Sequence, residues 1–363
     1  MHQREGWPAF TWDNERLQPG LGKVRHLQGR LTGKMESLGF DLQNEANLET
    51  ITADVLKSSE IEGERLPAMQ VRSSIARHLG MDIPGLVPSD RNVDGVVEMM
   101  LDATQKYKKT LTAERLSGWH SSLFPAGRSG MYNITAGQWR QEGTGPMQVV
   151  SGAMGKEKVH FEAPDPSKMK KEMAAFLKWF NKANDMDPVI KAALAHFWFV
   201  TIHPFDDGNG RIARAITDMV LARADDSTQR FYSLSAQIRI ERKGYYTILE
   251  RSQKGTLDVT EWLMWFLNCL LHALNASEDI LAKVLYKARF WKAHAEAVLN
   301  DRQKLMLNKL LDRFEGKLTS SKWAKITRCS PDTALRDIQD LITKGILRKE
   351  PAGGRSTNYE VVK

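Results

Sequence analysis

The amino-acid sequence predicts a mainly α-helical protein in which strands are confined to short hairpins. Apolar residues recur at three- and four-residue spacing along most of the 363-residue chain, and they make up 42% of it, enough for a large core. Alternation typical of strands is found only between residues 137 and 161 and close to the C-terminus. The length indicates more than one domain, since domains average roughly 100–200 residues.

The N-terminal part, residues 1–91, is predicted to be a helical extension. Its helices include Val24 to Leu38 and Leu48 to Lys57. We expect the helices of this part to be broken at Pro19-Gly20 and at Pro84-Gly85, because proline lacks the amide hydrogen that a helix interior needs.

Residues 92–275 are predicted to form the core of the protein. Gly137–Arg140, Met147–Gly152 and Lys158–Phe161 are short alternating segments around a glycine-rich turn, which indicates a β-hairpin. Downstream, Pro188 begins an apolar helix that leads to His203.

A second core helix is predicted from Arg211 by the helical spacing of the apolar residues that follow. The longest apolar run, Trp262 to Leu274, is interrupted by two polar residues and is shorter than the ~20 residues of a membrane span. It therefore predicts another core helix, and we expect no association with a membrane.

Helices over residues 276–300 are expected to lead to a separate C-terminal domain, residues 301–363. This domain is predicted to contain a short helix after Leu318, a second helix over Asp332–Lys344 with Pro331 at its start, and a hairpin. Residues 346–348 and 359–361 would be the strands of the hairpin. This order of elements resembles a winged helix-turn-helix.

The C-terminal domain holds 14 Lys and Arg against 8 Asp and Glu, so it supplies six of the eight net positive charges of the chain. Its second helix is expected to expose Asp332, Thr333, Arg336 and Asp337, and its hairpin carries Arg348, Lys349 and Arg355. The basic side chains favour DNA as a partner, whereas Asp337 and Asp340 argue against it. A protein-contact or dimerising module stays the alternative, because a fold does not determine its function.

The two cysteines, Cys269 and Cys329, are too few for a disulfide framework or a zinc cluster, which is typical of a reducing compartment. The residues after Met1 are not the apolar segment of a secretory signal. We therefore expect a cytoplasmic protein.

The segment richest in chemistry is His203-Pro204-Phe205-Asp206-Asp207-Gly208-Asn209-Gly210-Arg211-Ile212-Ala213-Arg214. Glycines on both sides of Asn209 permit a turn whose amide groups converge, and such a turn at the start of a helix binds anions. Arg211 and Arg214 lie on the first helical turn, where cations are unfavourable unless a polyanion binds. Asp207 is suited to Mg²⁺ beside phosphates, and His203 to a general base. A residue of any one of these types more often has a structural role than a functional one. Together, in one short segment, they indicate a functional site.

This segment matches every fixed position of the signature of Fic-domain proteins, His-Pro-Phe-x-(Asp/Glu)-Gly-Asn-Gly-Arg-x-x-Arg, so the chain resembles that family. Most members use ATP and Mg²⁺ to transfer AMP to a hydroxyl side chain of another protein. The resemblance implies a Fic-type helical core with a β-hairpin flap. Relatives that act as kinases carry Lys in place of Gly210, and the glycine therefore favours AMP transfer.

The resemblance also implies a role for each residue of the segment. His203 would be the catalytic base, Asp207 the metal ligand, and Phe205 the anchor of the loop. The nucleotide phosphates would be bound by Gly208, Asn209, Gly210, Arg211 and Arg214. Among these, Arg211 would bind the α- and β-phosphates, and Arg214 the γ-phosphate.

A second motif, Ser58-Ser59-Glu60-Ile61-Glu62-Gly63-Glu64, is by itself typical of a solvated helix end. Beside the first motif it resembles the inhibitory Ser/Thr-x-x-x-Glu-(Gly/Asn) element found N-terminal to the core of many Fic proteins. Glu62 would then pair with Arg214 and take the place of the γ-phosphate. The same carboxylate could orient water for the removal of AMP, and the sequence leaves the direction of the reaction open.

In Fic proteins the flap binds the target protein by strand addition, which requires little of the target's sequence. Ser151 and Gly152 lie where relatives also contact the nucleotide, and Tyr245-Tyr246 resemble the aromatic pair beside the adenine. Gln253 departs from the family, in which Asn often stands seven residues after the second tyrosine.

Two functions of different classes follow from the sequence. One is an autoinhibited protein adenylyltransferase, and the other is a DNA-binding regulator whose Fic core senses nucleotide. The intact His203 and Asp207 favour the enzyme. From the resemblance we also expect a homodimer.

Overall fold

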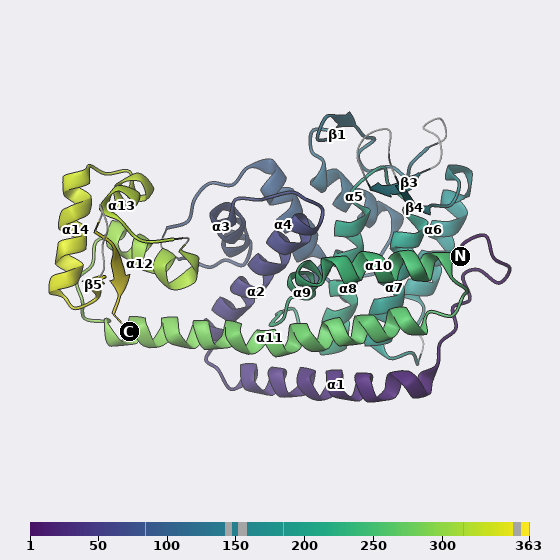
Figure 1. Cartoon of the computed structure of the whole chain (residues 1–363), viewed down its shortest axis with the longest axis horizontal. Coiled ribbons are helices and arrows are strands. Elements are labelled where there is room, and N and C mark those ends of the chain that lie inside the picture. Colours follow the sequence, from purple (N-terminus) through teal and green to yellow (C-terminus); the bar gives the residue numbers. More distant parts are fainter. Residues whose placement is uncertain are drawn as a thin grey trace. The chain divides into compact units, whose positions relative to one another are not determined.

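The computed structural model describes residues 1–83, 85–141, 147–151, 158–183, 185–314, 316–350 and 357–362. Within these ranges helices dominate, and the strands form three two-stranded sheets (Figure 1). The chain divides into two compact units, Met1–Leu79 with Pro88–Ile280 and Gly80–Val87 with Leu281–Lys363. The predicted extension and core both fall mainly in the first unit, and the boundary between them stays a prediction.

The described helices of the first unit are α1 (Asn14–Glu36), α2 (Phe40–Ile61), α3 (Ala68–His78), α4 (Arg91–Gln105), α5 (Ala113–Leu123), α6 (Met169–Asn181), α7 (Pro188–Ile202), α8 (Asn209–Asp225), α9 (Leu234–Ile240) and α10 (Arg242–Lys254). A short 3-10 helix, η1 (Pro166–Lys168), precedes α6. The long helix α11 (Thr260–Ala293) begins in the first unit and ends in the second.

Helix α1 continues through Pro19, so the predicted break at Pro19-Gly20 is wrong. Asp13 caps the helix and accepts hydrogen bonds from the amides of Glu15 and Arg16 at 3.0 and 3.2 Å. Proline in a helix interior costs about 3 kcal/mol. The helix nevertheless buries one apolar face, formed by Leu17, Val24, Leu31 and Met35. Burial of each such side chain contributes about 1.5–3 kcal/mol, which outweighs the cost of the proline.

Helix α11 runs unbroken from Thr260 to Ala293, so the boundary predicted at residue 275 falls inside a helix. The segment contains neither proline nor glycine, and nothing therefore ends the helix there. Within the first unit, α1 and the first half of α11 run parallel and side by side (Figure 1). They are joined by the ion pairs Arg16–Glu261 at 2.7 Å and Arg30–Glu278 at 2.6 Å.

Helices α7 and α8 pack along each other at the centre of the first unit. Asp187 caps α7 and accepts a 2.7 Å hydrogen bond from the amide of Val189. Pro188 fits the first helical position because an amide hydrogen has no helical partner there. Every residue from Val189 to Ile202 except Lys191 is buried, so α7 delivers the following residue, His203, from inside the core.

The predicted flap is present as a hairpin. Strand β3 (Gln148–Ser151) pairs antiparallel with β4 (Lys158–Glu162), and the register shifts between Val149 and Val150. A smaller hairpin, β1 (Arg128–Ser129) with β2 (Tyr132–Asn133), precedes it in the chain.

Gly137–Arg140 does not form a strand, contrary to the prediction. The amides of this segment are used by other partners. Gly137 donates to the His120 ring at 2.8 Å, and Arg140 donates to the carbonyl oxygen of Pro204 at 2.9 Å. The segment therefore connects α5 to the loop after α7 instead of joining a sheet.

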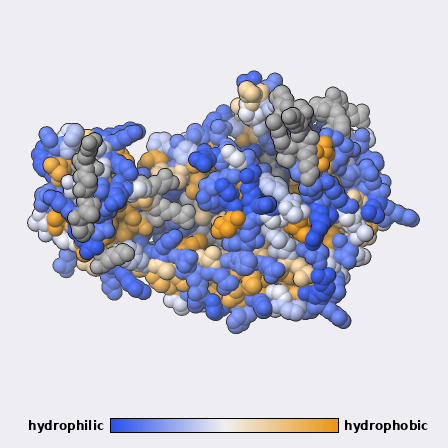
Figure 2. Space-filling model, viewed as in Figure 1, coloured by the Kyte–Doolittle hydropathy of each residue, from blue (hydrophilic) through white to orange (hydrophobic). Residues whose placement is uncertain are grey.

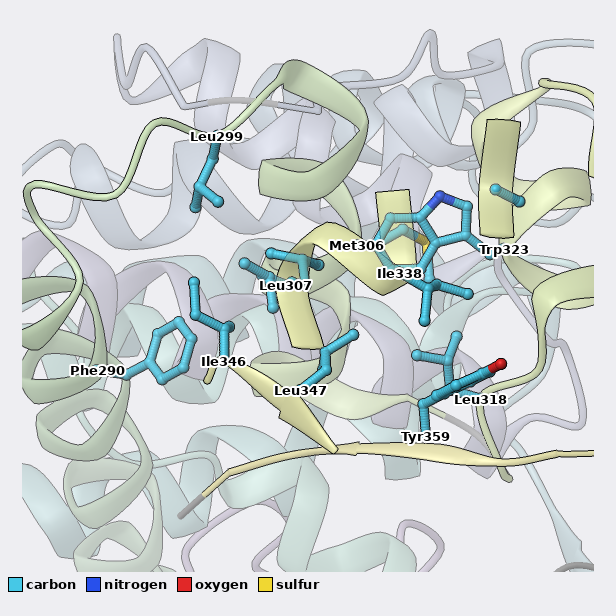
Figure 3. Packing of buried hydrophobic residues seen from close by; sticks show 12 residues of the cluster. Phe290, Leu299, Met306, Leu307, Leu318, Trp323, Ile338, Ile346, Leu347 and Tyr359 are labelled. Atoms are coloured by element: carbon cyan, nitrogen blue, oxygen red, sulfur yellow. The ribbon is translucent and has the colours of Figure 1, made fainter. Parts of the chain in front are cut away.

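The second unit contains α12 (Asp301–Arg313), α13 (Ser320–Thr327), α14 (Pro331–Thr343) and a hairpin of β5 (Leu347–Lys349) and β6 (Tyr359–Val361). The predicted helices and hairpin of this region are confirmed. Figure 3 shows how Trp323, Ile338 and Leu347 pack together with other apolar residues in one cluster. The assignment of these elements to a winged helix-turn-helix stays a prediction.

Asp337 is not exposed on α14, so this prediction was wrong. It is 6% exposed and accepts hydrogen bonds from Arg302 at 2.7 and 3.0 Å and from Asn300 at 2.9 Å. Asp340 accepts a hydrogen bond from Gln303 at 2.7 Å. Both carboxylates therefore join α14 to the start of α12, and the helical periodicity of α14 alone does not reveal partners on another helix.

None of the helices in the described part of the chain has the length and apolar character needed to cross a membrane. The surface in Figure 2 is mostly hydrophilic with scattered hydrophobic patches. Large exposed apolar side chains such as Phe40 at the start of α2 and Met131 between β1 and β2 lie in different parts of the chain, and scattered residues of this kind are normal for a protein surface.

We expect Gly95→Ala to destabilise the protein by about 2–3 kcal/mol, because overpacking of a close helix contact has this cost. A Cβ atom at Gly95 in α4 would lie 1.8 Å from the carbonyl oxygen of Ser122 in α5. Gly118→Ala in α5 is the matched control, since no neighbouring atom of the described residues lies within 4 Å of its Cβ position. The control should gain up to about 1 kcal/mol in denaturant unfolding. Equal stability of the two variants would contradict this packing.

Candidate functional site

The loop between α7 and α8 is shaped by its own residues. His203 ends α7 with a positive φ of 51°, and Gly208 begins α8 with a φ of 79°. The side chain of Asn209 accepts a hydrogen bond from the amide of Phe205 at 2.9 Å and donates one to the Phe205 carbonyl oxygen at 2.8 Å. The Phe205 ring is fully buried, as expected of an anchor. Asn209 therefore offers its backbone, not its side chain, to a bound anion.

Arg140, which the sequence analysis did not identify as a site residue, fastens the start of the loop. Its Nε donates to the carbonyl oxygen of His203 at 2.8 Å, and its Nη2 donates to the carbonyl oxygens of Pro164 and Ile202. A cation at this place also neutralises the negative end of α7. Because 63 residues separate Arg140 from His203, sequence spacing carries no signal for this contact.

The imidazole of His203 is arranged as a neutral base. Its Nδ1 lies 3.3 Å from the carbonyl oxygen of Val200, which can only accept, so Nδ1 carries the hydrogen and Nε2 the free lone pair. Burial is the main influence on the pKa of His203 and lowers it below the ordinary 6.5. Arg140 lowers this pKa further, whereas Glu62 and Asp207 raise it. The ring is therefore mainly neutral at pH 7 and able to accept a proton.

Asp207 is held by two residues that the sequence analysis missed. The Ser129 hydroxyl donates to Asp207 Oδ2, and His120 Nε2 donates to the Asp207 carbonyl oxygen at 3.2 Å. The tautomer of His120 follows from Gly137, whose amide donates to Nδ1 at 2.8 Å. His120 also stacks on Phe205, with ring centroids 4.1 Å apart. The Asp207 side chain remains 47% exposed, which leaves its carboxylate accessible to a metal ion.

The carboxylate of Glu62 lies against the first turn of α8. This helix begins without a side-chain cap, so its first amides are not used by a capping side chain. A Cβ atom built on Gly210 would lie 2.1 Å from Glu62 Oε1. The glycine therefore permits the approach of the carboxylate, whose negative charge also suits the positive end of the helix.

The structure brings Glu62 and Arg214 together. The Arg214 side chain is 1% exposed, and its Nη2 donates to Glu62 Oε1 at 2.8 Å. Ser58 adds two contacts, since it accepts from Nε through its hydroxyl at 2.8 Å and from Nη2 through its carbonyl oxygen at 2.9 Å. Arg214 Nη1 is buried and has no partner among the described residues. A buried donor without a partner costs about 1–3 kcal/mol, so this nitrogen favours the binding of an acceptor.

Arg211 is paired with a second carboxylate, which was not predicted. Its Nη1 donates to Glu64 Oε2 at 2.7 Å, and its Nη2 lies 4.0 Å from Asp207 Oδ2. The guanidinium lies over the ring of Phe124, 5.0 Å from the centroid. The sequence signal for Glu64 was its place in the acidic segment at the end of α2.

The two predicted aromatic residues lie in α10. Tyr245 is buried, and its hydroxyl lies 2.8 Å from His196 Nε2. The Tyr246 hydroxyl donates to the carbonyl oxygen of Ile61 at 3.5 Å, so Tyr246 lies beside the end of α2 that carries Glu62.

Three further predicted positions contribute less to the described site. Gln253 is buried and donates to the Thr201 hydroxyl at 3.3 Å, so its amide is used within the core. Ser151 is the last residue of β3, and Gly152 lies outside the described residues.

These groups together form an anion site beside a base. Arg211, Arg214 and the uncapped start of α8 supply positive charge next to the neutral imidazole of His203. Mg²⁺ usually takes one or two protein carboxylates and shares phosphate oxygens, and the half-exposed carboxylate of Asp207 fits that role. The arrangement can bind a polyphosphate and accept a proton from a hydroxyl group.

Residues 110–221 match the model of the Fic/DOC family, and residues 1–81 match a domain of unknown function, DUF4172. Protein adenylyltransferase fic-1 from Caenorhabditis briggsae is 30% identical over 216 residues, which are 56% of this chain and 40% of that protein. Protein adenylyltransferase Fic from Drosophila grimshawi is 26% identical over 236 residues, 63% of this chain and 43% of that protein. The chain thus spans less than half of the length of either relative. These matches support the Fic family.

Solved structures with the same fold include a Fic family protein from Desulfovibrio desulfuricans G20. Its TM-score is 0.54 at 20% identity, and the similarity covers 98% of each chain. Residues 134–508 of Fic-1 from C. elegans have a TM-score of 0.51 at 20% identity, over 75% of this chain and 74% of that one. The mainly helical, Fic-type fold predicted from the sequence is thereby confirmed.

We expect a nuclear magnetic resonance titration to show that His203 has a pKa below 6.5, because burial disfavours the charged ring. Glu62→Gln should lower this pKa further, since the carboxylate stabilises the imidazolium. His120, whose pKa burial lowers to about 4, is an internal reference in the same titration. A pKa above 6.5, or a rise in the variant, would show that the environment of His203 is not as described.

Proposed function

We propose that this Fic-domain chain is an autoinhibited protein adenylyltransferase that moves AMP from ATP to a Ser, Thr or Tyr hydroxyl of a target protein. The observation that supports this most is the junction of α7 and α8. There, a neutral His203, an accessible Asp207 and two arginines surround the uncapped start of a helix. The similarity to proteins named adenylyltransferases adds to it.

In the proposed reaction His203 Nε2 takes the proton of the target hydroxyl. The hydroxyl oxygen then forms a bond to the α-phosphorus of ATP in line with the bond that breaks, and pyrophosphate leaves. A positioned base of this kind contributes about 10²–10⁴-fold to the rate. Positioning and charge neutralisation supply much of the rest.

The positive charges of the site would bind the phosphates. Arg214 would contact the γ-phosphate and Arg211 the α- and β-phosphates, while the first amides of α8 would donate to phosphate oxygens. Asp207 would hold Mg²⁺, which neutralises charge that develops on the phosphate oxygens. Ser129 and His120 keep Asp207 in place for this role.

Glu62 would inhibit the enzyme by occupying Arg214. The Arg214 side chain of this pair is buried. Glu62 lies next to Gly210, in the space that a phosphate would occupy. Arg214 Nη2 already uses both of its hydrogens, one for the Ser58 carbonyl oxygen and one for Glu62, so a phosphate oxygen would have to displace Glu62 to bind this nitrogen. Activation would therefore require Glu62 to move away.

The target would bind along the flap. Strand β4 is held against α10 by the 2.6 Å contact of His160 with Glu250, and β3 has only β4 as a strand partner within the described residues. We therefore favour the outer edge of β3 for strand addition. Ser151 at the end of β3 and the aromatic pair Tyr245 and Tyr246 would contact the nucleotide.

Other expectations from the sequence belong to the same proposal. Glu62 could also orient water and make the enzyme remove AMP from its target. A homodimer is expected from the resemblance to the family, and a cytoplasmic location from the small number of cysteines.

We expect Glu62→Gly to raise the incorporation of label from ATP labelled on its α-phosphate, because Arg214 becomes free for the nucleotide. Adding His203→Ala to this variant should lower the incorporation by about 10²-fold or more, the contribution of a general base. His26→Ala, at an exposed position on α1, is the matched control and should have no effect. Label incorporation without His203 would contradict the assigned base, and an inactive Glu62→Gly variant would contradict autoinhibition.

A second candidate function is DNA binding by the C-terminal unit, and the inward position of Asp337 favours it. The sequence argument against DNA rested on the acidic residues of α14, and Asp337 is turned toward α12. Arg336 on α14 and Lys349 on β5 are exposed. Arg355 of the hairpin lies outside the described residues.

For this second function we expect a gel shift with genomic DNA fragments that weakens as salt rises. Arg336→Ala and Lys349→Ala should each reduce the affinity. Lys317→Ala is the control, because Lys317 is paired with Glu350 at 2.5 Å. If the chain leaves all fragments unshifted at low salt, DNA binding is excluded, and labelling by the His203 site is unaffected by that result.

A further inference from the structure

We infer that Glu64 is a second inhibitory carboxylate that controls access of the nucleotide to Arg211, as Glu62 does for Arg214. The inference rests on the proposed function and deepens it. It comes from one contact that the motif does not predict, the 2.7 Å hydrogen bond from Arg211 Nη1 to Glu64 Oε2. Both arginines proposed to bind phosphate are therefore held by carboxylates of the same short segment.

The segment that carries both carboxylates is a defined turn. The amides of Glu62 and Glu64 both donate to the carbonyl oxygen of Ser59, at 3.1 and 3.0 Å. Gly63 between them has a φ of 86°, which glycine adopts without strain. The turn thus presents two carboxylates, two residues apart, to two arginines that are three residues apart on α8.

The surroundings of Arg211 leave few of its donors accessible, so the contact with Glu64 affects how a phosphate can bind. The Arg211 side chain is only 7% exposed, and Phe124 covers a face of its guanidinium. Its Nε is buried and has no partner in the part of the chain that the structure describes. With Nη1 donating to Glu64 and Nη2 near Asp207, a phosphate oxygen has to compete with these two carboxylates for the guanidinium.

Glu64 can leave at a low cost, unlike a buried carboxylate. Its side chain is 41% exposed, so water replaces the lost hydrogen bond when the side chain turns outward. A nucleotide with phosphate at this position repays the displacement, because it restores a charge-assisted hydrogen bond to Arg211. Glu64 therefore weakens nucleotide binding without closing the site permanently.

The two carboxylates should act on different phosphates. Removal of Glu62 frees Arg214 and should favour ATP over ADP, because only ATP carries a γ-phosphate. Removal of Glu64 frees Arg211 and should help ADP and ATP to a similar degree. A variant that lacks Glu62 alone would then still be partly inhibited.

Calorimetric titration of the whole chain with ADP and with ATP, at fixed salt and Mg²⁺, tests the inference. We expect Glu64→Gln to bind ADP about two- to fivefold more tightly than the wild type, as for a partly exposed ion pair. The matched control is Glu60→Gln, which removes the same charge from the same helix end. Glu60 pairs with Lys57 at 2.6 Å and with Arg239 at 3.5 Å, not with Arg211, so the control should change the affinity less than twofold.

The same gain for ADP should appear when Glu64→Gln is added to Glu62→Gly. Equal affinities of Glu64→Gln and Glu60→Gln would overturn the role of Glu64. If Glu62→Gly binds ATP and incorporates label while those two variants stay equal, only this inference falls. If no variant binds either nucleotide, the proposed function and this inference both fail.

Discussion

The buried charge of Arg214 is the constraint on which the site depends. A guanidinium that is 1% exposed cannot lose its charge and needs an anionic partner, because an unpaired charge in the interior is strongly unfavourable. Glu62 supplies that partner from a helix 152 positions away in the sequence. The need for a counter-charge therefore ties the N-terminal extension to the core. A phosphate would satisfy the same need, which is why one arginine serves both the resting and the proposed nucleotide-bound state.

The loop that carries His203 is held in place by hydrogen bonds from several elements. Asn209 closes it on Phe205, Arg140 holds its first carbonyl oxygens, and His120 fixes the far end at Asp207. These contacts come from α5, α8 and the segment before the flap, so the catalytic groups depend on several parts of the core. Preorganisation of this kind lets electrostatic stabilisation act without a reorganisation cost. The two carboxylates proposed to inhibit the site are less enclosed, since their side chains are 32% and 41% exposed.

The sequence predicted those parts of the molecule that depend on neighbouring residues. The apolar helix before His203, the helix after Gly208 and the hairpin of the flap all follow from local spacing. Local rules failed where distant packing outweighed them. Pro19 stays inside α1 because the apolar face of that helix is buried, and Gly137–Arg140 gives its amides to His120 and Pro204 instead of to a strand.

The sequence by itself determined the mainly helical fold, the loop with the residues proposed to be catalytic, and the acidic segment proposed to inhibit it. Each of these features depends on residues that are close to one another along the chain, so short-range interactions decide it. Only the tertiary structure decided which side chains hydrogen-bond to these residues. Ser129 and His120 on Asp207, Arg140 on the loop and Glu64 on Arg211 are all brought together by folding, and so is Arg302 on Asp337 in the second unit. Periodicity describes one element at a time, whereas a hydrogen bond between two elements depends on how both are packed.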